Sequence, residues 1–170
     1  GAIEKLADNS VTPDRVYPTT DGDFSEWFIY GLKTRLTEKE LRDQFIDVLG
    51  DGRIEITAGN PAVSKNTGTG TKVDVYDNVT NELVETFYII IYGDVNGDAE
   101  VNAVDVSIVS DEALLITAWS VYGDEYKPYM LKAGDIKKDN YIDVLDESLI
   151  NAHALGRGVI NQETGLIEYD

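Results

Sequence analysis

Polar and apolar residues alternate along several short segments in the first half of the chain. Such period-two alternation is typical of half-buried β-strands. β-branched and aromatic residues, which favour strands, are enriched in the same segments. The expected extended segments are residues 3–6, 16–17, 27–30, 53–57, 72–76 and 83–92. The N-terminal half is therefore expected to be rich in β-structure.

One helix is expected among these strands. Residues 37–40 have the pattern of a capping box, in which Thr37 and Glu40 satisfy the first free amides of a helix. Apolar residues then follow with helical spacing at positions 41, 45, 48 and 49, and Gly50 ends the pattern. Short strands with a single helix predict a sandwich-like α+β fold for residues 1–92.

The aromatic run at residues 27–30 has two interpretations. It is either part of a buried sheet or a face on which sugar rings stack. Aromatic stripes usually indicate burial, so the sheet is the preferred interpretation.

The hydrophobic pattern changes after residue 92. Helical spacing is visible at residues 104–118 and 144–155, and Gly156 and Gly158 follow the second of these. A loop with a short helix is expected at residues 122–130. Residues 165–169 are expected to fold back as a strand or clasp, and residues 93–170 as a whole to form an all-α unit.

Residues 94–105 carry oxygen-bearing side chains with the spacing of an EF-hand-type calcium loop. Positions 1, 3, 5, 9 and 12 are Asp94, Asn96, Asp98, Asn102 and Asp105, and position 7, Glu100, would offer its backbone carbonyl. Two departures are visible, because position 6 is Ala99 where Gly is usual and position 12 is Asp where Glu is usual. The alternative is a polar turn on an acidic surface.

Residues 135–146 repeat this pattern at an offset of 41 residues, from 94 to 135. The candidate ligands of this second loop are Asp135, Asp139, Tyr141, Asp143 and Asp146. Position 3 is Lys137, whose ammonium group cannot ligate a cation and repels it. Two Ca²⁺ sites are expected, the second weaker than the first, and a distorted or empty second site is the alternative.

A GDVNGD opening at residues 93–98, a loop closed by Asp, one helix after each loop and a degenerate second copy resemble a dockerin over residues 93–158. Dockerins are the calcium-dependent modules that attach cellulosome components to cohesins. The preceding half resembles the X-module that precedes dockerins in some scaffoldins and surface-attached proteins, through the order of its elements and the pattern at residues 68–77.

This resemblance implies two domains, an X-module at residues 1–92 and a dockerin at residues 93–170. There is no Pro/Ser/Thr-rich linker between them, so a directly fused pair is expected to pack as one unit.

The resemblance to dockerins also implies which helix positions face the partner. These are Ala103, Val104, Ser110, Asp111 and Leu115 in the first copy, and Val144, Leu145, Asn151, Ala152 and Gly156 in the second. The two sets differ at most positions, so a single binding orientation is expected. Apolar Val104, Leu115, Val144 and Leu145 predict an apolar interface centre, unless they fill the dockerin core.

Composition excludes several classes of function. The 170 residues carry a net charge of −18, and residues 93–170 alone, with 16 acidic and 5 basic residues, carry −11. This acidity disfavours binding to nucleic acids and anionic membranes. The chain has no cysteine and a single histidine, His153, so a transition-metal site is not expected. No apolar run is long enough to cross a membrane.

The leading interpretation is a non-catalytic module that docks a scaffoldin or adhesin onto a cell-surface cohesin outside a bacterial cell. A carbohydrate-binding module with a structural calcium is the alternative, and a calcium sensor is the third interpretation. No motif indicates an enzyme. The chain begins at Gly1 and is expected to be an excerpt of a longer protein.

Overall fold

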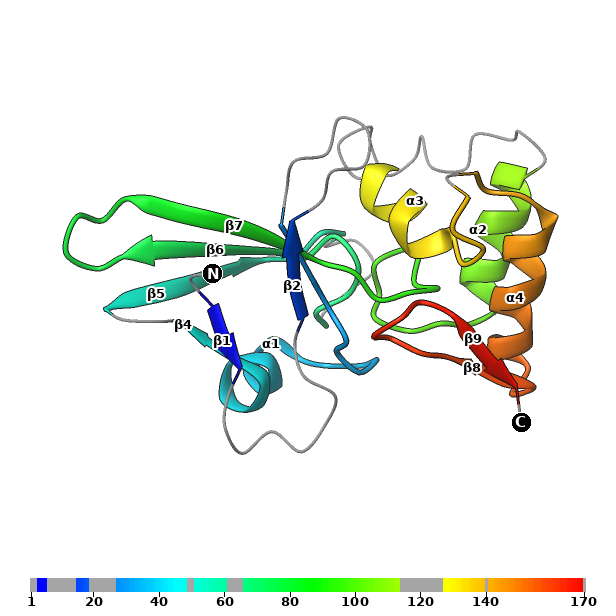
Figure 1. The fold of residues 1–170 in the computed structure, drawn as a ribbon, viewed down its shortest axis with the longest axis horizontal. Helices are drawn as coiled ribbons and strands as arrows, with labels where there is room; N and C mark the ends of the chain where they lie inside the picture. Colours follow the sequence, from blue (N-terminus) through cyan, green and yellow to red (C-terminus); the bar gives the residue numbers. More distant parts are fainter. Residues whose placement is uncertain are drawn as a thin grey trace.

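The computed structural model of the chain describes residues 3–5, 15–18, 27–48, 51–60, 66–113, 127–139 and 141–169. In Figure 1 the strands of the main sheet occupy one end of the molecule, and three helices, α2, α3 and α4, occupy the other. Among the described residues, none of the helices has the length and apolar character needed to span a bilayer.

The main sheet has five strands. In spatial order they are β2 (Arg15–Pro18), β3 (Trp27–Tyr30), β7 (Leu83–Ile89), β6 (Lys72–Asp77) and β5 (Gly52–Thr57). β3 and β7 run parallel, and the other neighbours pair antiparallel. The strands expected near residues 16–17, 27–30, 53–57 and 72–76 are confirmed, and the strand expected over residues 83–92 ends at Ile89.

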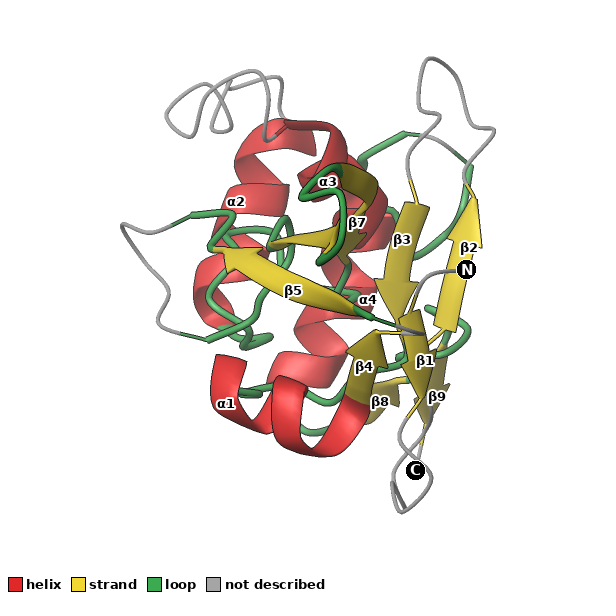
Figure 2. Ribbon diagram, turned by 90° about the vertical axis from the view of Figure 1, so that its left-hand side faces the viewer, coloured by secondary structure: helices red, strands yellow, loops and turns green. Residues whose placement is uncertain are grey.

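The expected helix after residue 37 is correct at its start and wrong in its length. The capping box between Thr37 and Glu40 is present and opens α1 (Glu38–Glu40), which continues as a π-helical turn, η1 (Leu41–Phe45). The chain then becomes strand β4 (Ile46–Val48), which pairs with β1 (Ile3–Lys5). Figure 2 shows α1 leading into β4 beside β1. β-branched residues at 46 and 48 favour this extended form, and Leu49 lies outside the described residues.

The C-terminal half contains α2 (Ala103–Ala113), α3 (Lys127–Gly134) and α4 (Val144–Ala154). It also contains a hairpin of β8 (Gly158–Ile160) and β9 (Ile167–Tyr169). The expected strand near the end of the chain is thus confirmed, and the expectation of an all-α unit is wrong. Gly156, with a φ of 72°, closes α4 and directs the chain into β8.

The sandwich-like interpretation of residues 1–92 is wrong as well, because the second face of the sheet meets helices. Side chains on β3 and β7 alternate between two cores. Ile29, Phe87 and Ile89 pack with η1 and β4 on one face of the sheet. On the other face Tyr88 stacks on Tyr129 of α3, with 4.4 Å between the ring centroids.

The second core therefore joins residues from both halves of the chain. Phe28, Ile90 and Tyr92 share it with Val109 of α2 and Ile150 of α4. The domain boundary at residues 92/93 stays a prediction. Phe28 and Ile29 of the aromatic run are buried, so these two residues offer no sugar-stacking face.

Candidate metal centre

The first loop, residues 94–105, follows directly from the segment after β7. Residues 90–92 are buried between the sheet and the helices, and they deliver the chain to Gly93, whose φ is 94°. The amide of Gly93 donates to the carbonyl of Ala133 on α3 at 2.8 Å, and that of Asp94 donates to the carbonyl of Ile91 at 3.0 Å. The segment after β7 and helix α3 thus determine where the loop begins.

Three carboxylates meet in the first loop. Oxygens of Asp94, Asp98 and Asp105 lie within 4.8 Å of one another, and Asp94 and Asp105 are fully buried. The Oδ1 atom of Asp94 accepts from the amide of Gly97 at 2.9 Å. Asp105, in the first turn of α2, accepts from the amides of Val95 and Asn102, both at 2.9 Å. The backbone of the loop therefore wraps around carboxylates from its first and last positions.

The backbone turns sharply where an EF-hand loop normally has glycine. Ala99, at position 6, adopts a φ of 67° although it carries a Cβ atom. Two hydrogen bonds hold it there: its amide donates to Asp94 at 2.9 Å, and its carbonyl accepts from the amide of Arg35 at 2.8 Å. The departure from glycine in the sequence does not change the shape of this turn.

The remaining candidate ligands of the first loop have other partners as well. Asn96 Oδ1 accepts from the amide of Asp98 at 3.3 Å. The Glu100 side chain forms an ion pair with Arg35, and the prediction for Glu100 concerned only its backbone carbonyl. Asn102 Oδ1 accepts from the amide of Val104 at 3.0 Å and so caps α2. The structure thus brings the three carboxylates together, with Asn96 beside Asp98.

Burial sets the electrostatics of this loop. It raises the pKa of Asp94 to about 7 and that of Asp105 to about 8, and the neighbouring carboxylates add to both shifts. Within the described part of the chain, no lysine or arginine forms an ion pair with Asp94, Asp98 or Asp105. Buried carboxylates without a counter-charge are costly. The oxygen donors suit a hard divalent cation such as Ca²⁺, so the first loop fits this metal.

Residues of the N-terminal half also enclose the first loop. The amide of Thr69 donates to Asp94 Oδ2 at 3.0 Å, and Asn60 Nδ2 donates to the carbonyl of Asn96 at 2.9 Å. Gly68 lies so close that a Cβ atom there would be 2.3 Å from the carbonyl oxygen of Gly97. The sequence did not predict these contacts. The pattern at residues 68–77 indicated only the resemblance to an X-module.

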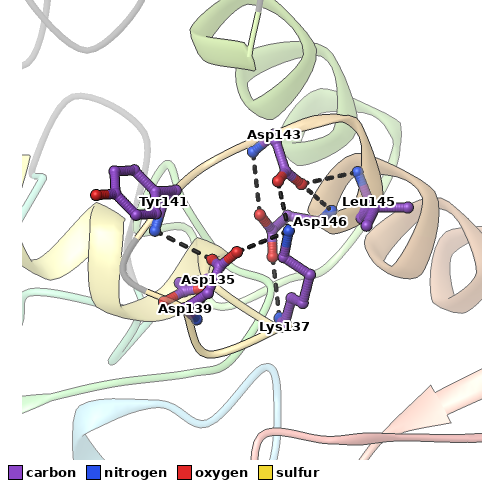
Figure 3. A network of polar contacts seen from close by, with 7 residues as sticks. All are labelled: Asp135, Lys137, Asp139, Tyr141, Asp143, Leu145 and Asp146. Atoms are coloured by element: carbon purple, nitrogen blue, oxygen red, sulfur yellow. Dashed lines mark hydrogen bonds and ion pairs between the residues drawn. The ribbon is translucent and has the colours of Figure 1, made fainter.

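The second loop, residues 135–146, has the same arrangement of carboxylates with one addition. Oxygens of Asp135, Asp139 and Asp146 lie within 4.8 Å of one another. The Lys137 ammonium lies among them and is paired with Asp139 at 2.7 Å and with Asp143 (Figure 3). Tyr141 is exposed, and its amide donates to Asp139 at 3.2 Å.

Lys137 also dominates the electrostatics of the second loop. Its hydrogen bonds hold the pKa of Asp139 and of Asp143 below the usual range, and the two carboxylates raise the pKa of Lys137. Burial raises the pKa of Asp146. The second loop therefore already holds a positive charge, which the first loop lacks among the described residues.

Residues 92–155 match the family model of the dockerin type I domain. This match covers 64 of the 170 residues and supports a dockerin domain in this segment. The match confirms the resemblance to a dockerin for this segment. Dockerins in general are non-catalytic modules that bind calcium and dock onto cohesins. The X-module has no such support and stays a prediction. Comparison with curated proteins found no match, and comparison with solved structures found none either.

Most residues expected to face a cohesin lie on or beside α2 and α4 of the dockerin. Val104, Val144 and Leu145 are 51%, 60% and 54% exposed, so these three do not fill the core. Ala103 and Gly156 are also exposed, whereas Ser110, Asp111, Asn151 and Ala152 are partly buried. Leu115 lies outside the described residues.

His153 has a structural contact in the dockerin half. Its Nδ1 atom accepts from the amide of Ile160 at 3.0 Å and thereby ties α4 to β8. Burial lowers its pKa, which favours the neutral ring that this hydrogen bond requires.

Proposed function

We propose that this chain is an assembly module in which the dockerin binds a cohesin and the N-terminal half acts as an X-module that stabilises the dockerin. The parent protein would be a scaffoldin or adhesin held by a cohesin at the surface of a bacterial cell. The dockerin match supports the cohesin partner, and the contacts of residues 60–69 with the first loop support the stabilising role.

The observation that carries the proposal is the continuity of the first loop with α2. Asp105 closes the loop and also lies in the first turn of that helix. When bound, calcium would supply the positive charge that the buried carboxylates of Asp94 and Asp105 lack. With its charge balanced, Asp105 can hold both the loop backbone and the start of α2. The helix then presents Val104 to solvent.

The exposed apolar residues form the proposed centre of the cohesin interface. α2 and α4 pack against each other, and each has an exposed valine in its first turn, Val104 on α2 and Val144 on α4. Apolar side chains at the centre of an interface contribute most of the binding free energy. The two helices differ at the other expected contact positions, such as Asp111 and Ala152, which supports one binding orientation.

The test is a calorimetric titration of the chain against a panel of purified cohesin domains. We expect binding to one class of cohesin in Ca²⁺ and none after removal of the metal. Val144→Ser should weaken binding by more than about tenfold. Val159→Ser makes the same substitution at an exposed valine on β8 and should leave binding unchanged. Equal affinity in both variants would refute the proposed interface, and binding to no cohesin would refute the proposed function.

A further inference from the structure

We infer that the second loop, residues 135–146, is closed by the ammonium group of Lys137 and takes no calcium, so that this chain binds one Ca²⁺ ion and not two. This inference rests on the proposed calcium binding only for the ion in the first loop. It concerns how the chain's own residues replace a metal that dockerins bind generally.

The backbone of the second loop is already folded as in the first. The amide of Asp139 donates to Asp135 Oδ1 at 3.2 Å, as that of Asp98 does to Asp94 Oδ1 at 3.2 Å. The amide of Asp143 donates to Asp146 Oδ2 at 3.0 Å, matching the bond from Asn102 to Asp105 at 2.9 Å. Both loops thus hold their first and last carboxylates in the same way.

The difference lies at position 3, where the first loop has Asn96 and the second has Lys137. Asn96 brings a carbonyl oxygen, which accepts from the amide of Asp98 at 3.3 Å. The Lys137 ammonium instead donates to Asp143 Oδ2 and pairs with Asp139 Oδ2 at 2.7 Å (Figure 3). The charge therefore lies between positions 5 and 9, two of the positions that would ligate a metal.

Both the geometry and the charge of Lys137 oppose a divalent ion in this loop. A calcium ion needs about six or more oxygen ligands, and Lys137 removes one ligand and engages two more. A divalent ion beside this ammonium would also meet direct repulsion. The Lys137 amide donates to Asp146 Oδ1 at 3.0 Å, so the backbone of this residue is held inside the loop.

The consequence is a division of roles between the two loops. The first loop depends on a metal because no lysine or arginine of the described residues pairs with its three carboxylates. In the second loop the counter-charge is the ammonium group of Lys137, which is part of the chain. Asp143 and Asp146 form a capping box at the start of α4, and this helix start therefore forms without calcium. Of the two helices that follow the loops, the metal then controls only α2 and not α4.

The test is a calcium count by calorimetry on the whole metal-free chain. We expect one ion for the native chain and two for Lys137→Asn, which gives the second loop the residue found at position 3 of the first. Lys138→Asn is the matched control, because it makes the same chemical change one residue later. Lys138 has a φ of 60°, which asparagine tolerates, and we expect this variant to bind one ion.

Two ions bound by the native chain, or no additional ion in Lys137→Asn, would overturn the inference. Asp135→Ala gives a second check, since removing a ligand that binds no metal should leave the count at one. Binding of no ion by the native chain would refute calcium binding by the first loop. In that case Lys137→Asn must still gain one ion relative to the native chain for the inference to stand.

Discussion

The side-chain amide of Gln162 makes two hydrogen bonds to the backbone of Tyr92. Its Oε1 atom accepts from the Tyr92 amide at 2.7 Å, and its Nε2 atom donates to the Tyr92 carbonyl at 3.0 Å. Lys138 lies over the ring of the same tyrosine, with Nζ 4.3 Å from the centroid. A segment beyond the family match thus closes over Tyr92, which lies two residues before the first loop.

We expect Gln162→Ala to destabilise the chain by about 1–3 kcal/mol, because it leaves a buried amide and carbonyl of Tyr92 without this partner. Thermal unfolding in Ca²⁺ measures the change. Leu166→Ala is the control, since Leu166 lies in the same β8–β9 connection and is 51% exposed. An equal loss of stability in the two variants would show that the hydrogen bonds to Tyr92 are not what matters.

The two calcium-loop aspartates at position 1 should respond very differently to substitution. Asp94→Asn removes charge from a buried carboxylate that organises the first loop, so we expect calcium affinity to fall by more than about tenfold. Asp135→Asn should lower thermal stability with little change in calcium affinity, because Lys137 supplies the charge in the second loop. Calorimetry with Ca²⁺ and thermal unfolding separate the two effects. Equal losses of affinity would contradict this asymmetry.

Gly68 offers a way to disturb the first loop from the N-terminal half. A Cβ atom at this position would lie 2.3 Å from the Gly97 carbonyl oxygen and 2.6 Å from the Ala99 amide nitrogen. Gly68→Ala should therefore push the loop out of shape and move the Thr69 amide away from Asp94. Loss of such outer contacts typically costs about 10–100-fold in metal affinity, which calcium titration measures.

Gly52→Ala is the control for this prediction. A Cβ atom at Gly52 would lie 2.8 Å from the carbonyl oxygen of Tyr76, so it also clashes with backbone, but between β5 and β6 and not at residues 60, 68 or 69. We expect lower thermal stability with calcium affinity less affected than in Gly68→Ala. If both variants bind calcium like the native chain, the N-terminal half does not support the first loop.

Features that depend on nearby residues could be predicted from the sequence, and those that join distant segments could not. The spacing of oxygen ligands and the capping box at Thr37 are local patterns. The bonds from Thr69 to Asp94 and from Gln162 to Tyr92 connect residues 25 and 70 positions apart. Nothing in the sequence pattern around these residues indicates that they are partners.

Tertiary pairing also explains the errors in the fold. A helical stripe through residue 48 was a reasonable expectation, but pairing of β4 with β1 took residues 46–48 into a strand. The strand at residues 83–92 was expected to belong to a sandwich, and Tyr88 of this strand instead stacks on Tyr129 of α3. The sequence alone indicated that the Lys137 ammonium would repel a metal ion in the second loop. Only the structure shows that Asp139 and Asp143 pair with this ammonium group.

The metal-free chain should lose stability as the pH rises from 6.5 to 8.5. Burial raises the pKa of Asp94 to about 7 and of Asp105 to about 8, above the usual value near 4 of an exposed aspartate. Between these values the folded chain binds more protons than the unfolded chain, so the free energy of unfolding falls as the pH rises through the raised pKa values. Thermal unfolding of metal-free chain across this range measures the effect.

Calcium should remove this dependence, because the bound metal favours the ionised carboxylates of the first loop. His153 acts in the opposite direction near the lower end of the range, because burial lowers its pKa and the unfolded chain then binds the extra proton. Asp94→Asn is the control, as it removes one of the two titrating groups and should flatten the slope in metal-free buffer. A metal-free chain equally stable at pH 6.5 and 8.5 would mean that the buried carboxylates of the first loop titrate near their ordinary values.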